Sequence, residues 1–276
     1  MQHLPARSLL LLSLFLSTSN LGVFAQDKVL ADKLAKRASM ECQEMKTAFR
    51  ALSHINEAIK LDPDNGSFYA LRAYVYLRME EDRQALDDIN HAIKLNPKAA
   101  YFHESKATIL VALKRNNEAL EEANKAVEME PNCTTKLTRA TILMNMGNLQ
   151  EAKVAFDKLA AEEKSDFRPR MRRIPLNKKL NCWDAVVEDS NFMIKFADKN
   201  SYSYKLHVLD RGIAYTKLKQ YDKAEQDLKQ ARKALPDVRE VHQALLALYE
   251  ITKRPREAMA EKTYLNELDE DIKPFK

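Results

Sequence analysis

Small apolar residues recur seven positions apart in three segments of the chain, each of which closes on a proline. The pairs are Ala51 and Ala58, Ala85 and Ala92, and Ala119 and Ala126. Seven residues make two turns of an α-helix, so both alanines of a pair face the same way. The pattern predicts helices whose alanine face lies close against a neighbouring helix. Because proline cannot continue a helix, each segment should end at Pro63, Pro97 or Pro131.

The same six-residue phrase ends each of these segments. It reads AIKLDP at residues 58–63, AIKLNP at 92–97 and AVEMEP at 126–131, so the step along the chain is 34 both times. Self-similarity at a period of 34 is typical of an array of helix–turn–helix repeats. An ordinary helical bundle with accidental periodicity does not explain three such phrases at equal spacing.

Two further stretches resemble the tetratricopeptide repeat (TPR) family. The segment RGIAYTKLKQYDKAEQDLKQARKALP, residues 211–236, is the best single match, and MGNLQEAKVAF, residues 146–156, is similar to the family's turn between two helices. In the first segment the residues at or near the eight signature positions are Gly212, Tyr215, Leu218, Tyr221, Ala224, Leu228, Ala231 and Pro236. The resemblance implies an all-α, right-handed solenoid with one concave and one convex face.

The signature alanine of the second helix gives the number of units. We place it at Ala51, Ala85, Ala119, Ala152, Ala185, Ala224 and Ala258, so the successive steps are 34, 34, 33, 33, 39 and 34. This predicts seven units over residues 26–276, near 32–65, 66–99, 100–132, 133–165, 166–204, 205–238 and 239–272. The fifth unit departs most, because Pro175 should kink or shorten its first helix. The longer step predicts an insertion of about five residues in the loop at 197–203.

Residues 1–25 have the features of a secretory signal peptide. Arg7 precedes the apolar stretch Leu9–Leu16, and Val23 and Ala25 fit a cleavage site. The apolar stretch is too short for a membrane anchor, so we expect cleavage after Ala25 and a mature chain that starts at Gln26. Export is most simply to a bacterial periplasm, with secretion or a secretory lumen as alternatives.

The three cysteines raise the question of a disulfide in an exported protein. In the predicted register Cys42 lies within a helix of unit 1, Cys133 in a loop, and Cys182 in the turn of unit 5. A first helix separates Cys133 from Cys182 by roughly 20 Å, whereas bonded cysteines need Cα atoms within about 7 Å. We therefore expect no intramolecular disulfide.

No catalytic motif is present. The chain has only 4 glycines and lacks a P-loop, an H-E-x-x-H pair and a G-x-S-x-G turn. The six histidines are scattered, which predicts no metal site. The acidic clusters Asp87–Asp88 and Glu121–Glu122 are interpreted as solvated helix faces. We expect no enzyme activity and no cofactor.

In the TPR family the concave face is formed mainly by first helices, at the second, fifth, ninth, twelfth and thirteenth positions of a unit. The resemblance therefore implies a partner-binding stripe, with a solvated helix face as the alternative. Its candidate residues are Tyr74, Arg78, Tyr101, Thr108, Met144 and Asn145. In unit 5 the same count gives Phe167, Arg170, Asn177 and Lys178.

The segment FRPRMRRIPLNKKL, residues 167–180, carries six basic residues and no acidic one. Export and the lack of interleaved stacking aromatics argue against nucleic acid. An acidic protein surface or anionic lipid headgroups are better candidates, and Arg170, Arg172 and Arg173 would make the contacts. The alternative is a local fluctuation of charge on a kinked helix.

Together these observations predict a non-catalytic scaffold or adaptor of the cell envelope that binds a protein or peptide along its concave face. The alternative function is recognition of an anionic envelope polymer or lipid surface through the basic segment of unit 5. The two differ in salt dependence, because binding through surface charge weakens steeply with salt. The formal net charge of +5 does not choose between them.

Overall fold

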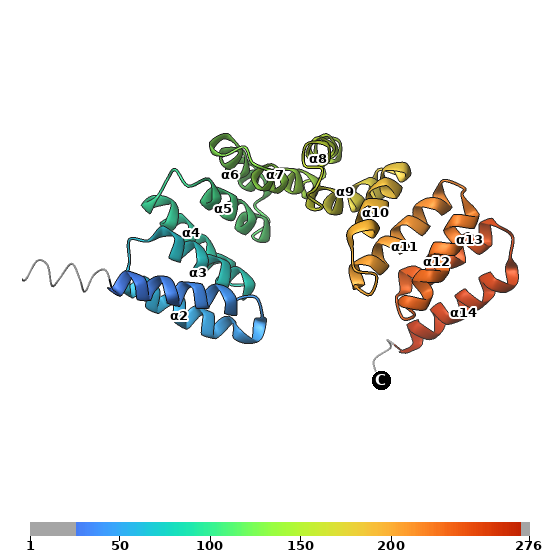
Figure 1. Ribbon diagram of the computed structural model, residues 1–276, viewed down its shortest axis with the longest axis horizontal. Coiled ribbons are helices and arrows are strands. Elements are labelled where there is room, and N and C mark those ends of the chain that lie inside the picture. The colour runs from blue at the N-terminus through green and yellow to red at the C-terminus, as the bar shows by residue number, and fades with distance from the viewer. Residues whose placement is uncertain (1–25, 272–276) are drawn as a thin grey trace, which may run out of the picture. The chain divides into compact units, whose positions relative to one another are not determined.

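The computed structural model describes residues 26–271, and these residues are helical with no β-strand among them (Figure 1). The predicted all-α repeat solenoid is confirmed. The predicted signal peptide, residues 1–25, lies outside the described residues, as does the last residue of the predicted seventh unit.

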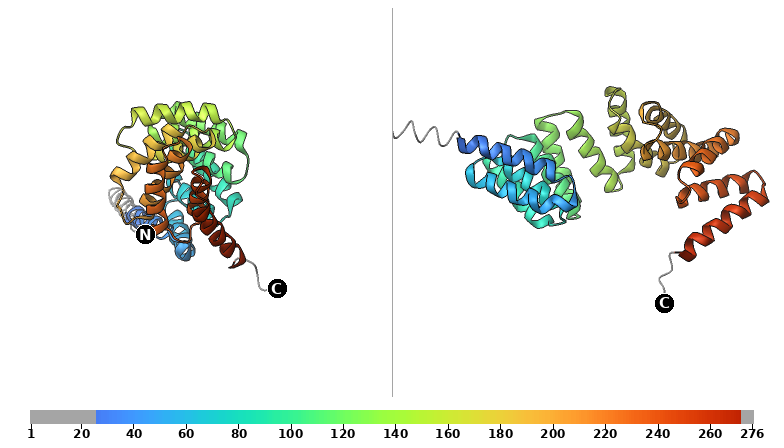
Figure 2. Two further views of the ribbon diagram at one scale, coloured as in Figure 1. Left: turned by 90° about the vertical axis from the view of Figure 1, so that its right-hand side faces the viewer. Right: turned by 60° about the horizontal axis from the view of Figure 1, so that its bottom comes forward.

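The described helices alternate as first and second helices of successive repeats (Figures 1 and 2). A helix over 26–41 is followed by a short 3-10 turn, η1 (Met45–Thr47), and by α2 (Ala48–Leu61). In chain order the others are α3 (Gly66–Arg78) and α4 (Asp82–Leu95), α5 (Ala100–Ala112) and α6 (Asn116–Met129), α7 (Cys133–Asn145) and α8 (Leu149–Glu162), α9 (Arg168–Lys179) and α10 (Trp183–Phe196), α11 (Tyr202–Lys217) and α12 (Tyr221–Ala234), and α13 (Arg239–Ile251) and α14 (Pro255–Asp271).

The chain divides into two compact units, residues 1–142 and 143–276, with the boundary inside α7. In both units each first helix packs on the helix that follows it, as α3 does on α4 and α11 on α12. First helices of successive repeats also touch, because α3 contacts α5 and α11 contacts α13.

Local chemistry sets the ends of the helices. Pro63, Pro97 and Pro131 lie in the loops after α2, α4 and α6, as predicted. The side chain of Asn65 caps α3 by accepting a hydrogen bond from the backbone amide of Ser67 at 3.1 Å, and Ser201 caps α11 in the same way.

In each repeat from α3 onward, the turn between the two helices has a left-handed residue two positions after the first helix. These residues are Glu80, Lys114, Gly147, Asn181, Lys219 and Lys253, with φ between 55° and 85°. A left-handed residue ends a helix because its backbone directs the chain away from the helix axis. Only one of the six is glycine, so the positions of glycine along the chain do not reveal this regularity.

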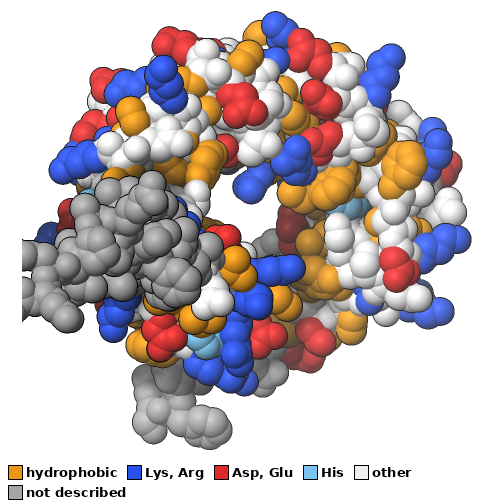
Figure 3. All heavy atoms as spheres, turned by 60° about the vertical axis from the view of Figure 1, so that its left-hand side comes forward, with side chains coloured by type: hydrophobic (Ala, Val, Ile, Leu, Met, Phe, Trp, Pro, Cys, Tyr) orange, Lys and Arg blue, Asp and Glu red, His pale blue; other side chains and the backbone are white. Residues whose placement is uncertain are grey.

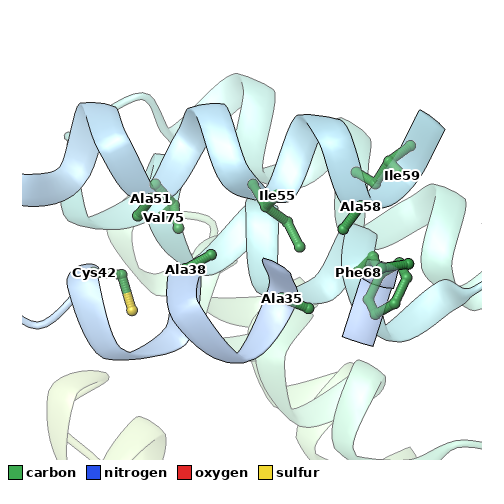
Figure 4. Close-up of a cluster of buried hydrophobic side chains, with 10 residues drawn as sticks. Ala35, Ala38, Cys42, Ala51, Ile55, Ala58, Ile59, Phe68 and Val75 are labelled. Atoms are coloured by element: carbon green, nitrogen blue, oxygen red, sulfur yellow. The ribbon is translucent and has the colours of Figure 1, made fainter. Parts of the chain in front are cut away.

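The core of the first unit is built from alanine-rich helix faces (Figure 4). Ala51 and Ala58 are fully buried and flank Ile55, which is also fully buried. The helix over 26–41 meets them with its own small residues, Ala35 and Ala38. Small side chains let two helices approach closely, and one buried isoleucine contributes about 1.5–3 kcal/mol.

The second unit has larger apolar side chains in its core. Leu209 of α11, Leu228 of α12 and Leu245 of α13 belong to one buried cluster. Gly212 lies against this cluster, where an added Cβ would come within 2.8 Å of a methyl carbon of Leu228. Glycine at this position therefore permits close packing of α11 on α12.

The register of the fifth repeat differs from the prediction by one residue. The buried fourth residue of its second helix is Val186, whereas Ala185 is only half-buried. With Val186 as the anchor, the steps before and after it become 34 and 38. The extra four residues are one in the loop at 197–201 and three in α11, which has 16 residues against 13 in α3, α5, α7 and α13.

Pro175 does not break its helix. α9 is continuous over 12 residues, one fewer than most first helices, with Pro175 inside it. Because proline has no amide hydrogen, the carbonyl of Met171 lacks the usual intrahelical bond at this point. The predicted shortening is small, and the helix keeps its place in the repeat.

The cysteines are not joined by disulfides within the described residues. The predicted register puts Cys42 within a helix, but it is buried in the turn that follows the helix over 26–41. Burial raises the pKa of its thiol, so that the neutral form is favoured.

Candidate partner-binding surface

Two tyrosines stand out on the first helices of the first unit. Tyr74 of α3 and Tyr101 of α5 are 45% and 46% exposed. Large aromatic side chains are more often buried, because burial of their apolar area stabilises the fold. The hydroxyl of Tyr101 lies 2.8 Å from that of Ser67, the second residue of α3, and this hydrogen bond fixes the ring. We call the exposed side of α3, α5 and the α7 residues up to Ile142 the first-helix face.

Side-chain hydrogen bonds connect the neighbouring helices of the first-helix face, and they recur at the 34-residue period of the array. Ser67 and Tyr101 are 34 residues apart, as are Glu104 and Thr138. The hydroxyl of Thr138 on α7 donates to a carboxylate oxygen of Glu104 on α5 at 2.8 Å. These bonds hold neighbouring first helices in register, so the face is preorganised rather than loosely solvated.

The other predicted residues of the stripe have mixed surroundings. Arg78 is half-buried and its Nη2 donates to the backbone carbonyl of Gln43 at 3.2 Å. Thr108 is exposed, and its hydroxyl donates to the backbone carbonyl of Glu104. At the end of α7, Met144 is half-buried and Asn145 is exposed. Sequence reasoning missed Ser67, whose spacing from Tyr101 by one full repeat was the available signal.

Most basic side chains of the α9 segment are bound within the protein, so few of them are available to a partner. Arg173 is only 7% exposed, and its guanidinium contacts the carboxylates of Asp189 and Asp157. The prediction that Arg173 contacts a partner is therefore not supported by its position. Arg173 is a candidate through its charge and not through the repeat count, and that charge is taken up by carboxylates within the fold. The one-residue shift in register applies to Asn177, which the count places on the stripe and the structure places in the interior.

Most other cations of the segment have internal partners too. The guanidinium of Arg168 pairs with Asp166 at 2.7 Å, and that of Arg170 stacks over the ring of Phe192 at 4.3 Å and donates to the carbonyl of Ala160. Arg172 is exposed, as is Lys179. Much of the positive charge is thus neutralised or used in packing.

Lys178 links three first helices of the second unit. Its ammonium lies 2.8 Å from Asp210 on α11 and 3.0 Å from Glu240 on α13. Burial lowers the pKa of Lys178, but the carboxylates of Asp210 and Glu240 raise it by more than burial lowers it. The pKa of Lys178 therefore lies above its usual value. The lysine remains charged and serves as an internal tie.

Metal-binding clusters and membrane-spanning helices are two features that residues 26–271 do not provide. No group of three or more His, Cys, Asp or Glu side chains in that range could hold a metal ion. Among the helices of that range, none combines the length and apolar character needed to cross a membrane. Acidic and basic side chains are interspersed on the face shown in Figure 3.

Comparison of the sequence with known protein families supports a helical repeat. Family models described as tetratricopeptide repeat match residues 71–132 and residues 209–234. No curated protein matches the sequence.

Solved structures show the same fold at low identity. The Pseudomonas aeruginosa protein pilF is 15% identical, with a TM-score of 0.65 over 79% of this chain and 97% of its own. PilW, described as a type IV pilus biogenesis factor, is 16% identical, with a TM-score of 0.64 over 78% of this chain and 98% of its own. A tetratricopeptide repeat protein of Parabacteroides merdae is 14% identical, with a TM-score of 0.57 over 86% and 93%. With the family matches and the helical repeat observed here, the chain is a tetratricopeptide repeat protein.

Proposed function

We propose that this chain is a non-catalytic scaffold of the cell envelope that binds a protein or peptide partner on the first-helix face of its first unit. The observation that carries the proposal is the pair of exposed rings, Tyr74 and Tyr101, on neighbouring first helices. Exposed tyrosines on a rigid scaffold are common anchors of protein interfaces, because they bury a large area at low cost in side-chain entropy.

The surroundings of the two rings support this use. Tyr101 is held by Ser67, and polar groups such as Thr108 are exposed on the same helices. A partner would find apolar area in the rings and hydrogen-bonding groups beside them, which is the usual composition of an interface.

The location in the cell envelope is part of the proposal. It rests on the signal-peptide features of residues 1–25, and periplasmic retention is the simplest form of it. The likeness to a type IV pilus biogenesis factor is one of fold and supports a scaffold role in general, without indicating the same partner.

Recognition of an anionic polymer or lipid through the basic segment has less support. Of its six basic side chains, Arg168, Arg170, Arg173 and Lys178 have partners within the described residues. The remaining exposed cations, Arg172 and Lys179, resemble an ordinary solvated surface. We keep this function as an outcome of the experiment below.

The experiment is an affinity pull-down from native cell envelopes with three baits. These are the unaltered chain, a Tyr74→Ala/Tyr101→Ala variant and a Tyr202→Ala variant. Tyr202 is a matched control because it is also exposed, at 60%, but lies on α11. We expect one protein to be recovered by the unaltered chain and the control, and lost with the double variant. Loss of about 2 kcal/mol from one anchor lowers affinity roughly 30-fold.

Two results would contradict the proposal. Equal recovery by all three baits would show that the tyrosines do not contact the partner. Retention of lipid or polysaccharide instead of protein, released by moderate salt, would favour the basic segment.

A further inference from the structure

A groove of about 510 Å³ lies between the last two described helices, α13 and α14. Its apolar lining includes Leu246 and Tyr249 of α13, and Ala258 and Met259 of α14. Met259 is 64% exposed, so the groove presents apolar surface to solvent. We call it the end groove. It is separate from the first-helix face and from the basic segment of α9.

The repeat shows what shape of ligand the end groove accepts. One repeat earlier, the corresponding surface of α11 and α12 receives a helix, because α13 contacts both of them. There Leu228 of α12 and Val241 of α13 share a buried cluster. No described helix follows α14, so the equivalent surface of the last repeat is left open to a helix from elsewhere.

The end groove differs in charge from the surfaces that earlier repeats bury. The eighth residue of the second helix is apolar in α2, α4, α8 and α12, where it is Ile55, Ile89, Phe156 and Leu228. In α14 this residue is Lys262, which is exposed and lines the end groove. A purely apolar helix would leave this ammonium without a partner, whereas a helix that carries carboxylates would pair with it.

A second lysine strengthens the preference for an acidic ligand. Lys253 also lines the end groove and is exposed, and neither Lys253 nor Lys262 has an ion-pair partner among the described residues. Arg254 is already engaged, because Glu225 and Glu257 each lie 2.8 Å from its guanidinium. Glu250 is the one acidic residue in the lining, so the available charge of the end groove is positive.

A second copy of this chain is a poor ligand for the end groove. The helix of a second copy with no described helix before it is the one over 26–41, whose exposed large apolar residues are Val29, Leu30 and Met40. That helix also exposes Lys28, Lys33, Lys36 and Arg37 against one exposed carboxylate, Asp32, so its exposed charge is positive, as is that of Lys253 and Lys262. Like charges at an interface oppose association.

We propose that the end groove binds an acidic amphipathic helix of a partner protein. One large apolar side chain of that helix contacts Leu246, Tyr249 and Met259, and its carboxylates pair with Lys253 and Lys262. This adds a second binding site to the array, so one chain holds two partners, or two parts of one partner, at once.

The test uses two fluorescein-labelled peptides of about 16 residues, near the length at which helices become stable in water. Both carry leucine on one helical stripe, and the other positions are mostly glutamate in one peptide and mostly lysine in the other. Fluorescence anisotropy with the purified protein at 0.15 M salt measures both affinities. We expect the acidic peptide to bind at least tenfold more tightly than the basic one.

Three variants assign that binding to the end groove. Met259→Glu should weaken the acidic peptide at least tenfold, and Val154→Glu, at a 69% exposed position on α8, should not. Lys253→Glu/Lys262→Glu should reverse the preference between the two peptides. All altered side chains are exposed, and circular dichroism checks that each variant folds. The charge-reversed variant decides the matter if Met259→Glu does not fold.

The proposal is overturned by any of three results. The peptides could bind equally, or the acidic peptide could bind Met259→Glu and Val154→Glu alike. Sedimentation could instead show a dimer of the unaltered protein that Met259→Glu dissociates, which would assign the end groove to a second copy.

Discussion

Arg173 of α9 and Asp189 of α10 form a buried ion pair with two parallel hydrogen bonds. The Nε of Arg173 donates to Oδ2 of Asp189 at 2.8 Å, and its Nη2 donates to Oδ1 at 2.6 Å. The remaining nitrogen, Nη1, donates to Asp157 of α8 at 2.8 Å. One guanidinium therefore joins both helices of its own repeat to the second helix of the preceding repeat.

The same arrangement recurs along the chain. Arg72 pairs with Asp88, and Arg211 with Asp227, again through two hydrogen bonds and again 16 residues apart. In these repeats the amide oxygens of Asn56 and Asn191 take the place of the Asp157 carboxylate, each at 2.8 Å. This arginine is thus a recurrent tie between repeats.

Removing one partner of the tie should be costly. In Asp189→Asn the carboxylate becomes a neutral amide, and Arg173 keeps its charge in a site that is 7% exposed. A buried charge left without a partner costs about 3–5 kcal/mol, but Asp157 still pairs with Arg173 in this variant. We therefore expect a loss at the lower end, about 3 kcal/mol, in the free energy of unfolding. Urea denaturation followed by circular dichroism measures it.

Two further variants separate this effect from general damage. Arg172→Ala removes an exposed arginine of the same helix and should change stability by no more than about 0.5 kcal/mol. Arg173→Met/Asp189→Leu replaces the whole pair and should be more stable than Asp189→Asn. If Asp189→Asn is as stable as Arg172→Ala, the pair contributes little.

Sequence periodicity reveals the repeat but not this tie. The fully buried alanines and the helix-ending prolines follow from spacing alone. The pattern along each helix favours solvated faces for the acidic clusters, yet Asp88 and Glu122 are only 8% and 7% exposed. The environment of Asp88 depends on Arg72, 16 residues earlier in another helix, and a pattern read along one helix does not include it.

The fifth repeat shows a second limit of sequence reasoning. Its first and second helices carry Arg173, Asn177 and Ser190 at buried positions. Val186 lies at the usual step of 34 residues after Ala152, but the choice of an alanine as the anchor selects Ala185 beside it. The same one-residue error places Asn177, which is fully buried, on the candidate binding stripe. The first-unit candidates Tyr74 and Tyr101, where the repeat is regular, are exposed as expected.

Glu122 should make stability depend on acid pH. Burial raises its pKa, but hydrogen bonds from His103, Lys125 and Lys106 lower it more, to about 2 from an ordinary 4.5. The unfolded chain therefore binds a proton more readily than the folded one. The contribution of Glu122 is present above about pH 4.5 and is lost as the pH falls toward 2.

The matched variants are Glu122→Gln and Glu121→Gln, which alter a buried and an adjacent exposed carboxylate. At pH 7 we expect Glu122→Gln to lower the free energy of unfolding by about 2–3 kcal/mol, and at pH 3 by clearly less. Glu121→Gln should behave as the unaltered protein does at both pH values. A Glu122→Gln deficit that is equal at pH 3 and pH 7 would exclude this linkage.

Asn177 is a candidate for stabilisation. It is fully buried, and neither its Oδ1 nor its Nδ2 has a hydrogen-bond partner within the described residues. At the equivalent position the other first helices from α3 onward carry Tyr76, Leu110, Leu143, Tyr215 and Tyr249. Burying an unbonded amide costs about 1–3 kcal/mol, so Asn177→Leu should raise the free energy of unfolding by about 1–2 kcal/mol.

The reverse change at the same repeat position is the control. Leu110→Asn puts an amide into the core of α5, where the leucine is 1% exposed, and should destabilise by about 3 kcal/mol or more. Thermal unfolding of both variants gives the comparison. A destabilised Asn177→Leu protein would mean that the amide of Asn177 makes a bond that matters.

The left-handed residue of each turn allows a paired test with opposite signs. Lys114 and Gly147 occupy equivalent positions, with φ of 60° and 85°. A residue with a Cβ is strained in this region by about 1–2 kcal/mol, and glycine is not, although glycine loses more entropy on folding. We therefore expect Lys114→Gly to stabilise by about 0.5 kcal/mol and Gly147→Ala to destabilise by about 1 kcal/mol, measured by urea denaturation.

Two features make this test specific to the backbone of the turn: the open space around Gly147, and a control variant with glycine inside a helix. No heavy atom lies within 4 Å of a Cβ added at Gly147, so the effect of Gly147→Ala would come from the backbone alone. Lys158→Gly, in the middle of α8, is the control for glycine in a helix and should cost about 1 kcal/mol. If Lys114→Gly and Lys158→Gly destabilise equally, the turn imposes no left-handed requirement.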